Sequence, residues 1–222
     1  GETLDLAARQ NILAMADELD CAVIEDAAYQ SLRFDGEAIP PMLALEIARK
    51  VSIEDCRTIY CGSFSKTLSP GLRVGWICAS KDVIGRLVLM KQAADLHSST
   101  INQMAICHVA QAMFDDHVAT IRDVYRARRD AMLEALTAHM PKGVTWTKPE
   151  GGMFVWVTLP DRMNGADLLA QSLKSERVAF VPGSAFYADG SGTNTLRLSF
   201  SRADAPTIAE GIKRLGALIS KA

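Results

Sequence analysis

One lysine, two serines and an arginine follow a single apolar stretch of this chain. They lie between Thr58 and Arg73 in the order Ser63, Ser65, Lys66, Arg73. A lysine amine can condense with a carbonyl to give a Schiff base. Two hydroxyls and a guanidinium can surround a phosphate dianion with hydrogen-bond donors and positive charge. The segment therefore indicates a site for an aldehyde that carries a phosphate.

A carboxylate and a phenol follow an earlier apolar stretch. Asp26 and Tyr29 stand at its end, and together with Lys66 they suggest pyridoxal 5'-phosphate. A buried carboxylate such as Asp26 keeps the ring nitrogen of that cofactor protonated. Tyr29 can donate a hydrogen bond to the 3-oxygen of the ring, and Lys66 can carry a proton between the substrate's alpha carbon and the cofactor.

Each of these residues also has an ordinary explanation. An Asp that closes a strand is commonly a loop residue or a helix cap, and a lone Tyr is often a core aromatic. A nucleotide-binding P-loop is a sharper alternative, because Lys66 and Thr67 follow a strand. However, Ser65 and Tyr60 stand where that motif requires glycine. The occurrence of both clusters in this order favours the cofactor site.

Apolar periodicity predicts the elements that position these clusters. Short, continuously apolar strands alternate with helices, which is typical of a mainly parallel sheet covered on both faces, with ligands at the carboxyl ends of the strands. We expect one strand to end at Asp26, a second to reach Gly62 and a third over residues 74–79. Thr3 is expected to cap the first helix, whose buried stripe would be Leu6, Ile12, Leu13, Ala16 and Leu19.

The second half of the chain predicts a different arrangement. Thr100 and Gln103 have the spacing of a capping box that begins a helix at Ile101, and a long helix follows over residues 115–140. A compact α+β unit comes next. Its expected strands are residues 144–147, 153–158, 178–181 and 195–200, with helices over residues 166–176 and from Pro206 onward.

Several stretches of the sequence resemble one enzyme family. The chain is similar to class I/II pyridoxal-phosphate-dependent aminotransferases of fold type I. Its sequence most resembles the aminoadipate, kynurenine and broad-specificity group of that family. The matching stretches are residues 23–29, 62–76, 149–156, 178–186 and 194–200. They span nearly all of the chain. The Ser-x-Ser-Lys segment with its following Gly-Leu-Arg is highly specific, whereas Gly-Gly-Met-Phe at residues 151–154 is only supportive.

The resemblance implies a fold and a domain division. It implies the C-terminal portion of a fold type I α/β transferase, with a mainly parallel sheet between helices, a long bridging helix and a small α+β C-terminal domain. Residues 1–114 would be the remaining part of the large cofactor-binding domain. Residues 115–222 would be the bridging helix and the small domain.

The resemblance also implies roles for individual residues. Lys66 would form the internal aldimine, Asp26 would pair with the pyridine nitrogen, and Tyr29 would contact the 3-oxygen. The phosphate would be held by Ser63, Ser65 and Arg73. Together these residues would form the catalytic and cofactor-binding site.

Arg197 matches the family arginine that binds the alpha-carboxylate of the substrate. The sequence supports this role independently, because alternation through Leu196, Leu198 and Phe200 directs those side chains to one face of a strand. Arg197 and Ser199 then point to the other face. The planar fork of an arginine suits a carboxylate, although without the resemblance an ordinary surface arginine would be the simpler interpretation.

The beginning of the chain departs from the family. A complete member is nearly twice as long, and Gly1 falls where the family has the last residue of an Asn-Pro-x-Gly turn. The upstream phosphate loop, the aromatic that stacks on the cofactor and the N-terminal arm would precede it. We therefore expect a truncated piece of a longer protein, inactive or only weakly active by itself.

Composition limits the possible partners. With 222 residues, 49% hydrophobic content and a net charge of −2, the chain reads as globular. The densest basic cluster, at Arg126, Arg128 and Arg129, is more typical of a solvated helix face than of a nucleic-acid site. No apolar run has transmembrane length. We expect no nucleic-acid or membrane partner.

The five cysteines favour a reducing compartment. They are odd in number, scattered, mostly inside apolar runs and without a Cys-x-x-Cys pair, so buried, reduced thiols in a cytoplasmic protein are the natural interpretation. The four histidines show no ligand spacing with them, and no metal site is expected.

The implied activity is transfer of an amino group from an amino acid to a 2-oxo acid, by a homodimer as is typical of the family. Two alternatives stay open. One is a beta-lyase or decarboxylase with the same cofactor and fold. The other is an aminotransferase-like effector domain of a transcription regulator, which a DNA-binding module upstream would indicate.

Overall fold

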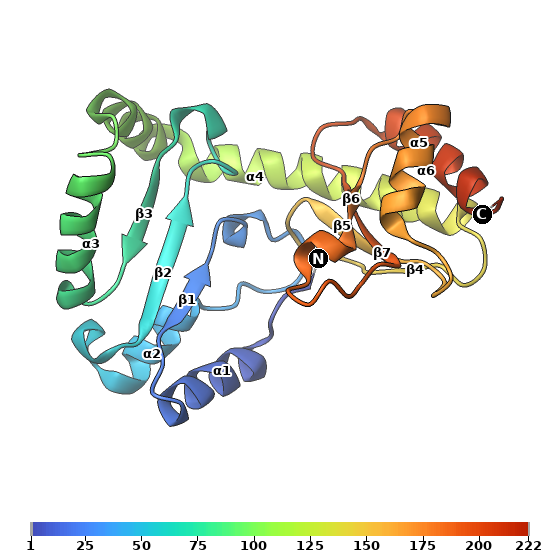
Figure 1. Cartoon of the computed structure of the whole chain (residues 1–222). Coiled ribbons are helices and arrows are strands. Elements are labelled where there is room, and N and C mark those ends of the chain that lie inside the picture. The colour runs from blue at the N-terminus through green and yellow to red at the C-terminus, as the bar shows by residue number, and fades with distance from the viewer. Residues whose placement is uncertain (1, 222) are drawn as a thin grey trace. The chain divides into compact units, whose positions relative to one another are not determined.

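The computed structural model describes residues 2–221, and the chain divides into two compact units. The first unit is Leu4–Ile121, and the second contains the chain from Arg122 onward. Helix α4 (Thr100–His139) contributes to both (Figure 1). None of the helices in residues 2–221 is long and apolar enough to cross a membrane.

A three-stranded sheet forms the centre of the first unit. Its strands are β1 (Val23–Asp26), β2 (Thr58–Ser63) and β3 (Gly75–Cys78), in that spatial order. β1 and β2 are parallel, and β3 runs antiparallel to β2. Because β1 and β2 are parallel and adjacent, their carboxyl ends lie at the same edge of the sheet, as the sequence predicts.

The first unit also contains the helices α1 (Leu6–Glu18), α2 (Met42–Lys50), α3 (Lys81–Ala94) and part of α4, with 3-10 turns η1 (Gln30–Leu32), η2 (Ile53–Asp55) and η3 (Pro70–Leu72). The predicted cap of α1 is wrong. Asp5, not Thr3, caps this helix, because its Oδ1 accepts a hydrogen bond of 2.7 Å from Ala8 N. Of the predicted stripe, Leu13 and Ala16 are buried, whereas Leu6 and Leu19 are exposed.

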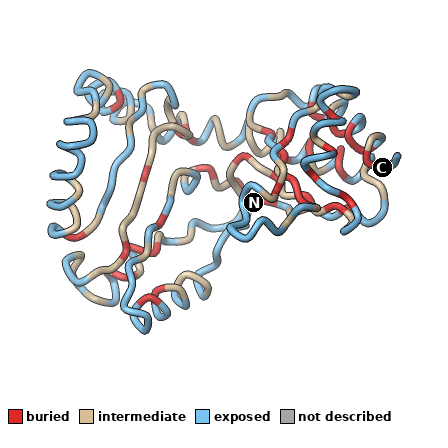
Figure 2. The backbone as a smooth tube through the Cα atoms, viewed as in Figure 1, coloured by how far each residue is buried: buried red, intermediate tan, exposed pale blue. Residues whose placement is uncertain are grey.

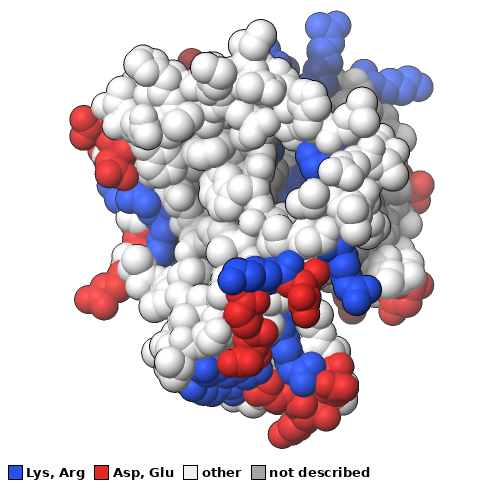
Figure 3. Space-filling view, turned by 90° about the vertical axis from the view of Figure 1, so that its left-hand side faces the viewer, with Lys and Arg blue, Asp and Glu red and all other residues white. Residues whose placement is uncertain are grey.

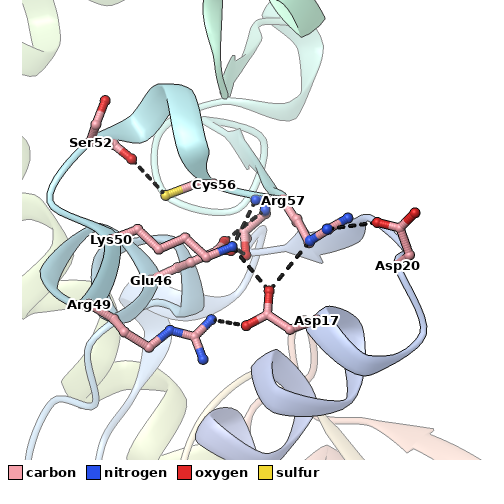
Figure 4. Close-up of polar contacts among 9 residues, drawn as sticks. Asp17, Asp20, Glu46, Arg49, Lys50, Ser52, Cys56 and Arg57 are labelled. Atoms are coloured by element: carbon pink, nitrogen blue, oxygen red, sulfur yellow. Dashed lines mark hydrogen bonds and ion pairs between the residues drawn. The ribbon is translucent and has the colours of Figure 1, made fainter.

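A cluster of charged side chains connects α1 and α2 to the start of β2 (Figure 4). Glu46 of α2 is only 1% exposed. Its Oε1 accepts from Arg57 N at 3.0 Å, and its Oε2 accepts from Thr58 N at 2.9 Å and Thr58 Oγ1 at 2.7 Å. Lys50 Nζ lies 2.9 Å from Glu46 Oε1 and 3.0 Å from Asp17 Oδ1. The residues that open β2 are thus fixed by a buried carboxylate.

The charge state of Glu46 follows from the same contacts. Burial by itself raises the pKa of the Glu46 carboxyl, but hydrogen bonds from Arg57, Thr58 and Lys50 outweigh it and hold the pKa below its usual value. Lys50 is the other member of this ion pair, and its hydrogen bond to Glu46 is the main cause that raises the pKa of Lys50. Both groups are therefore charged at neutral pH.

One face of the first unit exposes apolar side chains. α3 buries none of its residues, and Val88, Leu89 and Met90 on it are exposed, as are Trp76 and Ile77 of β3. α3 is accordingly tan and pale blue in Figure 2. In the space-filling view of Figure 3, uncharged side chains fill much of the upper part, whereas acidic and basic side chains gather at the bottom.

The second unit has its own antiparallel sheet, in the order β4-β5-β7-β6. Its elements are β4 (Thr145–Trp146), β5 (Phe154–Thr158), α5 (Gly165–Ser175), β6 (Val181–Pro182), η4 (Gly183–Phe186), β7 (Thr195–Ser199) and α6 (Ala205–Ile219). Helix α6 buries the predicted residues Ile208, Ile212, Leu215 and Ile219. The predicted strand at residues 178–181 is wrong in extent, because β6 begins only at Val181.

Helix α4 is longer than predicted. It is continuous from Thr100 to His139, with no break before residue 115. The capping box is also wrong: Ser99 precedes the helix, and its Oγ accepts a hydrogen bond of 3.4 Å from Asn102 N. Gln103 Nε2 donates instead to the carbonyl oxygen of Ser98, at 2.9 Å.

Candidate functional site

The carboxyl end of β1 places Asp26 beside β2. Asp26 is the last residue of β1 and stands opposite Cys61, and the next residue, Ala27, donates its N–H to the Cys61 carbonyl at 2.9 Å. Asp26 Oδ1 accepts from Ala28 N at 3.2 Å. The side chain is exposed, so the expectation of a buried carboxylate is wrong for this chain. Burial, followed by the negative charge of Asp26, raises the pKa of the Cys61 thiol.

The buried carboxylate of β1 is the preceding residue, Glu25. It is 8% exposed, and its two oxygens accept from Met42 N at 2.9 Å and Leu43 N at 3.2 Å. These N–H groups open α2 and have no partner within the helix. Glu25 therefore anchors α2 to the sheet. Alternation of faces along β1 is the sequence signal for this difference between Glu25 and Asp26.

A tight turn after β2 carries Lys66. The carbonyl oxygen of Phe64 accepts three successive N–H groups, and Phe64 N donates to the Val74 carbonyl at 3.1 Å. The donors are Thr67, Leu68 and Ser69, at 3.3, 2.9 and 3.1 Å. The Phe64 ring packs against Trp76 of β3, with ring centroids 4.6 Å apart. The backbone of the lysine is thus held from both ends of the turn.

Lys66 and Tyr29 lie close together. Lys66 Nζ stands 5.7 Å from the centroid of the Tyr29 ring. Tyr29 directly precedes η1, and Lys66 follows β2. The two side chains therefore come from segments far apart in the sequence. The structure therefore brings together one side chain from each of the two clusters that the sequence predicts as one site.

The predicted phosphate-binding residues occupy the same turn and its exit. Ser63 ends β2, and its Oγ accepts from Ser65 N at 3.0 Å. Arg73 is exposed, with its backbone in the left-handed region at φ 54° and ψ 45°. Its Nη1 donates to the Pro70 carbonyl at 3.3 Å. A non-glycine residue in this conformation is uncommon. Four others among residues 2–221, none of them a predicted site residue, also have positive φ: Asp20, Val51, Leu96 and Arg177.

Thr67 adds an unusual feature that the sequence does not signal. Its hydroxyl is buried, in a residue only 4% exposed, and has no hydrogen-bond partner among the described residues. Most buried hydroxyls in proteins do have one. An unsatisfied polar atom therefore sits directly beside Lys66.

Arg197 lies in the second unit, on β7. It is half-buried, and its Cζ stands 4.0 Å from the ring centroid of Phe154 and 4.7 Å from that of Phe186. The predicted alternation is confirmed, because Leu196 and Leu198 are buried on the opposite face of the strand. The side chain thus lies on the half-exposed face of this sheet.

An apolar pocket of about 210 Å³ also lies in the first unit. Its lining residues come from the segment after Lys66 and from α4: Leu68, Ser69, Leu72, Ala105, Ile106, Val109, Met113 and His117. It includes none of the predicted site residues. Among residues 2–221, no group of three or more His, Cys, Asp or Glu side chains is arranged to hold a metal ion.

Comparison with known proteins gives a consistent result. The family model "Aminotransferase class I and II" matches residues 1–215. A 2-aminoadipate transaminase of Thermus thermophilus is 45% identical over 97% of this chain and 53% of its own length. The structure is similar to that of an alpha-aminoadipate aminotransferase from Thermus thermophilus complexed with N-(5'-phosphopyridoxyl)-L-leucine. This match has a TM-score of 0.92 and 42% identity, and covers 100% of this chain and 56% of that one.

A relative with a different name also matches. The uncharacterised HTH-type transcriptional regulator YdfD of Bacillus subtilis is 34% identical over 96% of this chain and 42% of its own length. The chain spans about half the length of the relatives it matches.

Proposed function

This chain belongs to the class I and II aminotransferase family, and on that basis we propose that it is part of a pyridoxal-phosphate-dependent aminotransferase. The whole protein would transfer an amino group from an amino acid to a 2-oxo acid. The single observation that carries the proposal is the approach of Lys66 Nζ to the Tyr29 ring, at 5.7 Å. It unites an amine and a phenol at the edge where β1 and β2 end.

The side chains at this edge fit pyridoxal phosphate chemically. Asp26 supplies a carboxylate for a cationic ring nitrogen, Tyr29 a donor for the 3-oxygen and Lys66 an amine for the aldehyde. The phosphate would be bound by Ser63, Ser65 and Arg73. The buried, unsatisfied hydroxyl of Thr67 supports a ligand site at this turn.

The roles of the protein residues follow from their chemistry. When bound, pyridoxal phosphate supplies an electron sink for the carbanion at the alpha carbon of the substrate. Lys66 would hold and return the proton at that carbon, because a neutral amine is a competent general base. Asp26 would accept a hydrogen bond from the ring N–H. Arg197 would bind the alpha-carboxylate through its planar N–H fork.

Cofactor attachment can be tested on this chain directly. The chain is mixed with pyridoxal phosphate, reduced with borohydride and digested, and the modified lysine is found by mass spectrometry. We expect the label on Lys66 and its loss in Lys66→Arg, which keeps the charge. Lys91, whose amine pairs with Asp95 at 2.8 Å, is an internal control that should stay unlabelled. Labelling of many lysines with none preferred would contradict the proposal.

The chain itself should turn over slowly or not at all, as the sequence predicts. Adding an amino donor and 2-oxoglutarate and following glutamate formation tests this, and rapid turnover would refute it. The same products separate an aminotransferase from a beta-lyase or a decarboxylase. A beta-lyase would instead release the beta-substituent of its substrate together with a 2-oxo acid and ammonia, and a decarboxylase would release carbon dioxide and an amine.

A second candidate function is the effector domain of a regulator. It is suggested only by the 34% identity to YdfD, which is lower than the 45% identity to the 2-aminoadipate transaminase. The two functions differ in the fate of the amino group. In an effector domain, the complete protein would bind pyridoxal phosphate and an amino acid without releasing a 2-oxo acid at a useful rate. Assay of the complete reading frame with both substrates decides between them.

Organisation and location are also proposals. We propose domains over residues 1–114 and 115–222, supported by the division of the chain at Ile121 and Arg122. We further propose a homodimer in a reducing cytoplasm. The compartment is supported by the free state of all five cysteines. The expectation that they are buried is wrong for Cys21, Cys78 and Cys107, which are exposed.

A further inference from the structure

The sheet of the second unit has two chemically different faces. Val155 and Val157 of β5 are buried, whereas Phe154 and Trp156 alternate with them on the other side. Arg197 stands opposite Trp156 in the β5–β7 register, so it shares the face of Phe154 and Trp156. A cation therefore lies on an aromatic surface.

Two rings contact the guanidinium of Arg197. Its Cζ lies 4.0 Å from the Phe154 centroid and 4.7 Å from the Phe186 centroid. Both distances are within the roughly 6 Å at which a cation is attracted by the face of a ring. One ring comes from β5 and the other from η4. We call Phe154 and Phe186 the aromatic clamp.

The position of Phe186 is set independently of Arg197. η4 packs so closely on β7 that a Cβ added to Gly183 would lie 1.8 Å from Thr195 Oγ1. The Phe186 ring also meets Trp156 edge to face, with centroids 5.5 Å apart. The clamp is thus held by contacts of its own, and a fixed clamp can orient the arginine.

The hydrogen-bonding capacity of Arg197 is left open. Among residues 2–221 its guanidinium makes no hydrogen bond or ion pair with a carboxylate. Guanidinium groups that are half-buried usually find a partner. Because the rings hold the cation through their faces, which offer no carboxylate or carbonyl oxygen, the N–H groups of Arg197 remain available for a planar anion.

We propose that Phe154 and Phe186 are positioning residues, which hold the Arg197 guanidinium oriented for bidentate binding of the substrate's carboxylate. This inference rests on the proposed function, in which Arg197 binds that carboxylate. The clamp restricts the arginine before the ligand arrives, so less conformational entropy is lost on binding. A lysine at position 197 would gain neither the stacking nor the planar fork.

The test uses the complete chain and the probe 4-methylpentanoate, a monocarboxylate with an apolar tail. The Nε–Hε resonance of Arg197 is identified by its loss in Arg197→Lys and followed by NMR during titration, at constant ionic strength set with chloride. We expect Phe154→Leu and Phe186→Leu each to weaken binding about twofold to fivefold, the factor that corresponds to an exposed cation–π contact. Without the probe, each should shift this resonance and increase its exchange with water.

Matched variants complete the test. Tyr187→Leu removes an exposed aromatic that contacts Trp156 but not Arg197, and it should leave the affinity unchanged. Phe186→Tyr keeps the ring and should restore wild-type binding. Since Phe186 is 49% exposed, Phe186→Met preserves volume without a ring and replaces the leucine variant if that one fails to fold.

The outcomes separate the two ideas. Wild-type affinity in both leucine variants, with binding still lost in Arg197→Lys, overturns the clamp and leaves the carboxylate role of Arg197 intact. Absence of a saturable shift in the wild-type chain overturns that role, and the positioning inference with it. Equal weakening in Tyr187→Leu would show a general disturbance of the loop and would also overturn the clamp.

Discussion

Replacing Glu46 by glutamine should destabilise the first unit by about 3–5 kcal/mol, in the range found when one partner of a buried ion pair is removed. The carboxylate accepts hydrogen bonds from Arg57 N, Thr58 N, Thr58 Oγ1 and Lys50 Nζ, in a side chain that is 1% exposed. Glutamine keeps one oxygen and places an NH₂ group where the other stood. Two of the four donors then face a donor, and a hydrogen bond to a buried charged group contributes about 1.5–3 kcal/mol.

The assay is urea unfolding at pH 7, with hydrogen exchange read on peptides that cover α1, α2 and β2. The matched control is Glu54→Gln, whose carboxylate is exposed and accepts one backbone N–H, from Lys81 at 2.9 Å. We expect the control to change the free energy of unfolding by less than about 1 kcal/mol. In Glu46→Gln, exchange should accelerate at the Arg57 and Thr58 amides first.

The pH dependence provides an independent check. Since the pKa of Glu46 is lower in the folded chain than in the unfolded chain, its stabilisation is fully present above the unfolded pKa and is lost as pH falls through the folded pKa. Glutamine does not titrate, so the difference between the two proteins should shrink on acidification below about pH 4. A difference that stays constant down to pH 2, or no loss of stability at pH 7, would refute the reasoning.

Three further outcomes are expected. Gly183→Ala should destabilise the second unit by more than about 2 kcal/mol in urea unfolding, because the added Cβ would lie 1.8 Å from Thr195 Oγ1; wild-type stability would contradict this. Thr67→Val should leave stability unchanged or raise it by up to about 1 kcal/mol, since it removes a buried hydroxyl without a partner, and a clear loss would reveal a missed hydrogen bond. Cys56 should react with iodoacetamide more slowly than exposed Cys21 in a mass-spectrometric time course, because burial raises the pKa of the Cys56 thiol; equal rates would count against it.

The sequence predicts most of the elements that position the site. Short apolar runs predict the strand end at Asp26 and place the end of β2 at Gly62, one residue before the observed Ser63. The core face of α6 follows from its helical period. The apolar runs of the strands and the helical period of α6 both arise from residues that are buried or stand next to buried residues. The approach of Lys66 to Tyr29 follows in turn from the parallel pairing of β1 and β2.

Other features could not be read from the sequence for identifiable reasons. The sequence does not predict α3, because none of its residues is buried and its apolar residues do not mark a core face. The first turns of α4 have the same character, since Ile101 and Met104 are exposed. Caps were misplaced by one or two residues, because Asp5, Thr3, Ser99 and Thr100 are all competent capping types. The stacking of Arg197 on two rings depends on η4, which has no sequence period of its own.

The open edges of the first sheet have a practical consequence. β3 is an outer strand, and its four residues, Gly75–Cys78, include no lysine, no proline and no charge, which are the usual means by which proteins prevent strand addition. Its unpaired backbone groups can therefore template pairing with any extended segment that meets them. A concentrated solution of this chain should accumulate β-rich aggregates that bind thioflavin. The substitution Ile77→Lys should delay their appearance.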